Sequence, residues 1–241
     1  MTPPAEARSR RPIARLLAAE AGLTYFLISL FLLIFVLYPL AEPRTITRYL
    51  LDGITLLVLI SGAEAVSDRR RALFRCVVGL AALSFLLQLL THSYLDRSIL
   101  LLKHVSAMLF LIVVAGTVLS RVLRGGRITT HRIQGAVAVY LMLGLIWAGA
   151  YSLVFLCDPT SFDLGPSMEG MVDLEAIQTR GMSRLIYFSF VTMTTVGYGD
   201  ITPQSVVAGN LAILQALTGQ IYLVVILARL VSLAVATSER E

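Results

Sequence analysis

The sequence predicts an all-α integral membrane protein with six transmembrane helices and one short re-entrant segment. Hydrophobic residues make up 57% of the 241 residues and charged residues only 15%, whereas a soluble domain carries about 25% charged residues. The mean hydropathy is +0.80, and the apolar residues stand in long blocks rather than in an amphipathic pattern. These observations favour helices that cross a bilayer over helices that cover a soluble core.

The length of each apolar block separates the spanning helices from the re-entrant segment. A helix needs about 20 apolar residues to cross a hydrocarbon core about 30 Å thick. Six blocks come close to this length, so we predict spans at 22–40, 50–66, 76–95, 99–120, 135–157 and 205–235. The apolar block 185–193 is too short to span and is predicted to enter and leave the membrane on one side.

The distribution of basic residues predicts the orientation. With the N-terminus in the cytoplasm, 14 of the 20 Arg and Lys residues fall inside and six fall outside. Because cytoplasmic loops carry an excess of Lys and Arg, this bias predicts a multi-pass protein of the plasma membrane with both termini cytoplasmic. The net charge of +5 is then a consequence of topology, and no nucleic-acid partner is expected.

A change in composition near residue 125 divides the chain into two domains. We predict an N-terminal cytoplasmic tail and a four-helix peripheral domain over 1–124, a cytoplasmic linker over 125–134, and a second domain over 135–241. The second domain holds a helix, a polar loop, the short apolar segment, a glycine-containing stretch and a final helix. We expect no soluble ligand-binding domain in this chain.

The glycine-containing stretch, residues 195–200, reads TVGYGD and carries the chemistry. A cation stripped of its water needs replacement oxygens, and in an apolar protein the densest supply is the backbone. Successive carbonyls can face one axis if the chain alternates between ordinary and left-handed conformations, and glycine adopts positive φ at little cost. Gly197 and Gly199 therefore suit a tube lined by carbonyl oxygens. The side chains of Val196 and Tyr198 would turn outward into packing that holds the tube open.

The same stretch resembles the selectivity filter of potassium channels. Residues 182–194 stand where that family has its pore helix, and Gly219 stands where many members have a hinge glycine. The likeness covers roughly 135–235, whereas the first four helices match in number and topology only. The resemblance implies that K⁺ binds to the Thr195 hydroxyl and to the backbone carbonyls of Thr195, Val196, Gly197, Tyr198 and Gly199.

Four residues are expected to support the filter, namely Thr194, Asp200, Tyr187 and Val191. Val191 stands where some bacterial relatives have a glutamate that pairs with the filter aspartate, so Tyr187 is an alternative partner for Asp200. Ser183 is predicted to cap the N-terminus of the pore helix, because serine is favoured at that position.

The final helix offers an inner gate. Leu223, Leu227 and Val231 recur every four residues and so share one helix face. Four copies of that face would form an apolar constriction that blocks ions by dewetting, and Gly219 would let the helix bend. The alternative is that these residues pack against the fifth helix and that the pore closes at the filter. Arg229 is expected to reach the cytoplasmic interface.

The fourth helix lacks the pattern of a voltage sensor. Sensors carry three to four gating charges per subunit on an arginine-rich helix. Residues 98–120 hold Lys103 and His104 near the outer end, and the next basic residue is Arg121. We therefore predict an ordinary packing helix and little dependence on voltage.

The resemblance implies a potassium-selective channel that conducts K⁺ passively through the central pore of a homotetramer, surrounded by membrane lipid. One alternative is a subunit of a potassium uptake transporter, although such chains carry several degenerate filter loops. The other is an enzyme or receptor that merely spans the membrane. We predict no enzymatic activity and no cofactor, since no nucleophile–base set and no metal cluster is visible. The sequence predicts no gating stimulus.

Overall fold

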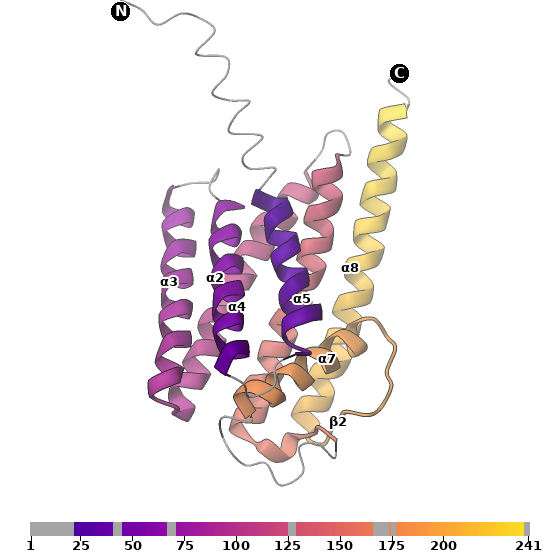
Figure 1. Cartoon of the computed structure of the whole chain (residues 1–241). Helices are drawn as coiled ribbons and strands as arrows, with labels where there is room; N and C mark the ends of the chain where they lie inside the picture. The colour runs from indigo at the N-terminus through magenta and orange to yellow at the C-terminus, as the bar shows by residue number, and fades with distance from the viewer. Residues whose placement is uncertain are drawn as a thin grey trace, which may run out of the picture.

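The computed structural model describes residues 22–40, 45–66, 71–124, 129–165, 174 and 177–238. Within these residues the chain is all-α apart from two strands of two residues each (Figure 1). The predicted cytoplasmic tail up to residue 21, part of the predicted linker and part of the polar loop lie outside the described residues.

Four helices form the first part of the chain. The first helix, Gly22–Leu37, ends in a π-helical turn at Leu33–Leu37. It is followed by α2 (Thr45–Glu64), α3 (Arg71–Ser93) and α4 (Arg97–Val122). Helix α4 begins where the carboxylate of Asp96 accepts a hydrogen bond from the backbone N–H of Ser98 at 2.8 Å. That bond satisfies one of the amides that have no partner in the first turn of a helix.

Three α-helices, two short helical turns and a small hairpin form the described residues of the second part. The elements in chain order are α5 (Thr130–Cys157), η2 (Pro159–Ser161), β1 (Phe162–Asp163), η4 (Ile177–Gly181), α7 (Met182–Met193), β2 (Thr202–Pro203) and α8 (Val206–Ser238). The strands β1 and β2 are antiparallel, with Phe162 opposite Pro203. This pairing brings the polar loop after α5 against the segment that leads into α8.

Four helices of the described chain are long and apolar enough to cross a membrane: α3, α4, α5 and residues Val206–Ser232 of α8. They confirm four of the six predicted spans, with boundaries that differ by several residues. The helix Gly22–Leu37 is shorter than a spanning helix, and α2 begins before the predicted start at residue 50. The first two spans therefore stay predictions. Helix α7 has 12 residues, which confirms that the block 185–193 is part of a short helix.

Helix α5 joins the two parts of the fold, because it contacts α4, α7 and α8. The main hydrophobic core lies between α4 and α5 and includes Val114 and Val118 of α4 with Ala138 and Met142 of α5. In Figure 1, the short helix α7 lies at the end of the bundle where α3 and α5 finish, and α8 extends toward the opposite end. The short helix α7 thus lies at one end of the longer helices α3, α5 and α8.

Candidate functional site

Helix α7 starts as a continuation of the π-helical segment η4 rather than at a capped end. Its N-cap residue is Gly181, which has helical dihedrals and makes no side-chain capping bond. The prediction that Ser183 caps this helix is therefore wrong. The Ser183 hydroxyl instead donates a hydrogen bond to the backbone carbonyl of Tyr38 at 2.8 Å. This bond ties the start of α7 to the end of the first helix.

A buried hydrogen-bond network fixes α7 between α5 and α8. The amide of Gln215 on α8 donates to the Ser189 carbonyl at 2.9 Å and to the Ser189 hydroxyl at 2.6 Å. The Ser189 hydroxyl donates to the Gly144 carbonyl of α5 at 2.7 Å, and the Tyr151 hydroxyl donates to the Gln215 side-chain oxygen. Gln215 is fully buried, so this network satisfies polar groups that would otherwise be costly to bury.

Aromatic side chains pack beside this network. The rings of Tyr151, Phe162 and Phe188 lie edge to face in a triangle, with centroids 5.1 to 5.6 Å apart. They come from α5, β1 and α7 respectively, and all three are buried. Edge-to-face pairs are favoured by the ring quadrupole, so the cluster anchors the polar loop and α7 to α5.

The backbone after α7 folds back on the end of that helix. The N–H of Thr195 donates to the Thr192 carbonyl at 3.1 Å, and the N–H groups of Val196 and Gly197 donate to the Val191 carbonyl at 3.0 and 3.4 Å. Within the described residues, no hydrogen bond reaches the backbone carbonyls of 195–199. The stretch therefore uses its first amides for anchoring and leaves its carbonyl oxygens available.

The backbone of this stretch visits the left-handed region at every second residue. The φ angles are 60° at Thr195, 58° at Gly197 and 77° at Gly199. The left-handed backbone predicted at the two glycines is present. The positive φ of Thr195 was not foreseen, and it is unusual because a β-branched residue resists that region. Such strain is concentrated at functional sites, where the surrounding structure maintains it.

The side chains of Val196 and Tyr198 are exposed in the single chain, at 51% and 71% of their full accessible area. The packing predicted for them is therefore not supplied by this chain itself. Exposed apolar side chains of this size are typical of sites that contact another protein or the membrane.

Asp200 lies close enough to Tyr187 for the two side chains to interact. The partnership between these two residues stays a prediction. The next residue, Ile201, is buried, and the N–H of Gln204 donates to the Ser161 carbonyl at 2.8 Å. The segment that follows the stretch 195–200 is therefore held by the polar loop.

Helix α8 presents two different faces. Tyr222, Ile226 and Leu230 contact the main core, and the Tyr222 hydroxyl donates to the Ala136 carbonyl of α5 at 2.6 Å. Leu223, Leu227 and Val231 lie on another face, with 46%, 65% and 53% of their areas exposed. These three side chains are therefore largely uncovered by α5 of the same chain. The inner gate and the alternative of packing against the fifth helix with closure at the filter both stay predictions.

Gly219 lies at the closest approach of α8 to the end of α7. A Cβ atom at this position would stand 2.7 Å from the Met193 Cγ atom and 2.8 Å from the Met193 carbonyl oxygen. Helix α8 is continuous through Gly219. The absence of a side chain here permits the close packing of two helices, whether or not the helix also bends there.

Two site features were missed by sequence reasoning. Ser189 and Tyr151 complete the network around Gln215, and the signal for Ser189 was a small polar residue in the middle of an apolar block. Arg229 donates from two guanidinium nitrogens to the Leu123 carbonyl at 3.1 and 3.2 Å. Arg229 of α8 thus binds the C-terminal end of α4. The sequence alone could not predict this contact, because α4 and α8 meet only in the folded chain.

Residues 139–236 match the model of a protein family described as "Ion channel". The match runs from α5 through α7 and the stretch 195–200 to the end of the described α8 span. No curated protein and no solved structure matches the chain. Residues 139–236 are therefore an ion-channel pore domain in a multi-pass membrane protein, and the prediction that the chain is not an enzyme is confirmed at the level of the family.

Proposed function

We propose that this chain is one subunit of a potassium-selective channel that conducts K⁺ passively through a central pore. The observation that carries the proposal is the backbone of 195–199. It has left-handed residues at alternate positions and carbonyl oxygens with no hydrogen-bond donor among the described residues. This stretch follows a short helix inside an ion-channel domain, and non-helical backbone persists at membrane depth where it lines a cavity.

In the proposed mechanism, the carbonyl oxygens of 195–199 and the Thr195 hydroxyl replace the hydration shell of K⁺. Rings of backbone carbonyls are the known chemical solution to this task. The Gln215 network holds α7 in place ahead of the stretch, and Tyr187 is proposed to support it through Asp200, which lies near Tyr187. Thr194 and Val191 contribute through the backbone turn at the end of α7. Selectivity then depends on how rigidly the neighbouring residues hold these oxygens.

The channel is proposed to be a homotetramer. Each chain supplies one stretch 195–199, and one stretch cannot surround an ion, whereas the filter of potassium channels uses four. The exposed side chains of Val196 and Tyr198, and the exposed face of α8 with Leu223 and Leu227, support contacts with further copies. Crosslinking in mild detergent is expected to give a ladder that ends at four subunits. A conducting monomer or dimer would contradict this assembly.

Potassium flux into liposomes tests the function class. The purified chain, reconstituted alone, is expected to pass K⁺ down its gradient without an energy source. A subunit of an uptake transporter would require partner chains, and a receptor would pass no ions. Liposomes without protein are the control, and the absence of flux in folded, tetrameric protein would refute the proposal. The proposed location is the plasma membrane, with both termini cytoplasmic.

The inner gate is proposed to lie at the exposed face of α8 that carries Leu227. Replacing Leu227 with asparagine should raise the open probability, because a polar ring of side chains keeps the constriction wet. Single-channel recording measures this change. The matched control is Leu86→Asn on α3, which is also exposed and is expected to leave gating unaltered. An unchanged open probability in Leu227→Asn would place the gate at the filter.

The same recordings test the role of α4. Between Arg97 and Arg121 this helix carries Lys103 and His104 as its basic residues. Because a sensor moves several charges through the field, the open probability is expected to be nearly flat with voltage. Steep voltage dependence would contradict this assignment.

A further inference from the structure

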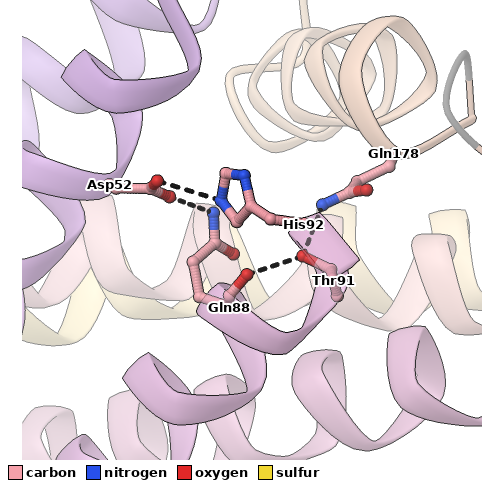
Figure 2. A network of polar contacts seen from close by, with 5 residues as sticks. All are labelled: Asp52, Gln88, Thr91, His92 and Gln178. Atoms are coloured by element: carbon pink, nitrogen blue, oxygen red, sulfur yellow. Dashed lines mark hydrogen bonds and ion pairs between the residues drawn. The ribbon is translucent and has the colours of Figure 1, made fainter. Parts of the chain in front are cut away.

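A polar network crosses the end of the bundle near α7 (Figure 2). Asp52 of α2 accepts a hydrogen bond from the Gln88 amide at 2.9 Å and contacts the His92 Nε2 atom at 3.0 Å. Both partners lie on α3. The carboxylate of Asp52 is 11% exposed and the His92 side chain is 24% exposed, so the imidazole is accessible to protons while its partner is largely shielded.

The network continues to the segment that starts α7. The Thr91 hydroxyl donates to the Gln88 carbonyl at 2.7 Å and accepts a hydrogen bond from the Gln178 amide at 3.0 Å. Gln178 belongs to η4, which runs directly into α7. We call Asp52, Gln88, Thr91, His92 and Gln178 the outer network.

Gln178 also faces the helices behind it. It lines a small cavity together with His104 of α4 and Ser152 of α5. Its amide therefore bridges the end of α3 and the region where α4, α5 and α7 meet. A shift of Thr91 would reach η4 through the hydrogen bond that Gln178 donates to the Thr91 hydroxyl.

The charges around His92 come from several helices. Asp52 on α2 is its ion-pair partner, and Lys103 on α4 interacts electrostatically with Asp52. From α3 itself the neighbour is Gln88, and from η4 the network member is Gln178, both of which are uncharged. Asp52 is thus shared between two basic side chains, His92 and Lys103.

We propose that protonation of His92 controls how firmly the outer network holds the start of α7, and that proton concentration on this side of the membrane thereby regulates conduction. The inference rests on the proposed channel function. An imidazole ordinarily changes charge between pH 5 and 8. A protonated imidazole adds charge attraction to its contact with the Asp52 carboxylate, and a neutral imidazole lacks that attraction.

The direction in which pH is expected to change conduction follows from that difference. When His92 is protonated, the charged pair holds α2 to α3, Thr91 keeps its position, and Gln178 holds η4 against the bundle. As the pH rises, His92 loses its proton and the pair weakens. The start of α7 then becomes less constrained, and so does the stretch 195–199 that follows it. Conduction is therefore favoured at low pH.

Planar-bilayer recording with the pH changed on one side at a time tests the proposal. Coupling between sites typically changes an equilibrium by a factor of about 5 to 150. We expect the open probability to be about fivefold higher at pH 5.5 than at pH 8, when the pH is changed on one side only. His92→Gln keeps a donor near Asp52 without the charge, and it is expected to bring the ratio close to one.

A second variant separates transmission from the ion pair itself. Gln178→Leu leaves the pair of Asp52 and His92 intact. If this pair acts without Gln178, the variant keeps the pH response. The proposal requires that the variant loses the pH response. His131→Gln, on α5, is the matched control and should retain the fivefold ratio. Tetramer elution in detergent confirms that each variant is folded. A pH response that persists in His92→Gln or in Gln178→Leu overturns the proposal.

The outcomes also separate this inference from the function it rests on. A parent protein that conducts equally at both pH values contradicts the proton coupling alone. A parent protein that passes no potassium at either pH contradicts the channel function, and the coupling is rejected with it.

Discussion

Replacement of Gly199 by alanine is expected to abolish potassium conduction or to admit sodium. Gly199 has a φ of 77°, and no atom lies within 4 Å of the position that a Cβ would take. The methyl group therefore meets no neighbour within the chain, and its effect comes from backbone strain. A left-handed conformation costs an L-residue roughly 1–2 kcal/mol, and a tetramer would carry this strain four times. The measurement is the potassium-to-sodium permeability ratio of the reconstituted variant.

The matched control for Gly199→Ala is Gly79→Ala. Gly79 lies within α3, where a Cβ likewise meets nothing within 4 Å and the backbone is helical. Alanine is favoured over glycine in a helix by roughly 1 kcal/mol, so this variant should fold and conduct normally. An unchanged potassium-to-sodium permeability ratio in Gly199→Ala would show that the stretch 195–199 does not determine selectivity.

Replacement of Gly219 by alanine is expected to lower both the thermal stability and the conduction of the protein. The new methyl would overlap the Met193 carbonyl oxygen, which cannot move aside as a flexible side chain can. Such overpacking typically costs 1–3 kcal/mol. Helix α8 would have to move away from the end of α7, which immediately precedes the stretch 195–199. Thermal unfolding in detergent and single-channel recording measure the two effects.

Gly209→Ala on the same helix is the control for Gly219→Ala, because a Cβ at Gly209 meets nothing within 4 Å. It should raise or preserve the unfolding temperature. If Gly219 acted solely as a hinge, Gly219→Ala would alter the open probability and leave the unfolding temperature unchanged. That result would contradict the packing role.

Much of the site could be predicted from local sequence patterns. Block length was sufficient to find α3, α4, α5 and α8, and the short block 185–193 indicated α7. Glycine at alternate positions predicted the left-handed backbone at Gly197 and Gly199. In these cases the physical cause lies in the local sequence. The length of an apolar block matches the thickness of a bilayer, and glycine adopts positive φ at little cost.

The remainder depends on contacts between segments distant in sequence. The φ of Thr195 follows from the bonds that anchor its neighbours to the end of α7, and Ser183 bonds to Tyr38 instead of its own helix because the first helix ends beside it. Arg229 meets the end of α4 for a similar reason. Gln88 and Gln215 form hydrogen bonds between helices. Their partners could not be identified from composition.

The reversal potential of the purified wild-type protein, with potassium on one side of a planar bilayer and sodium on the other, tests the central claim most directly. If the carbonyl oxygens of 195–199 replace the hydration shell of K⁺, potassium should carry nearly all the current. The reversal potential should then lie far from zero, on the side set by the potassium gradient. A reversal potential near zero, with sodium and potassium equally permeant, would contradict the account.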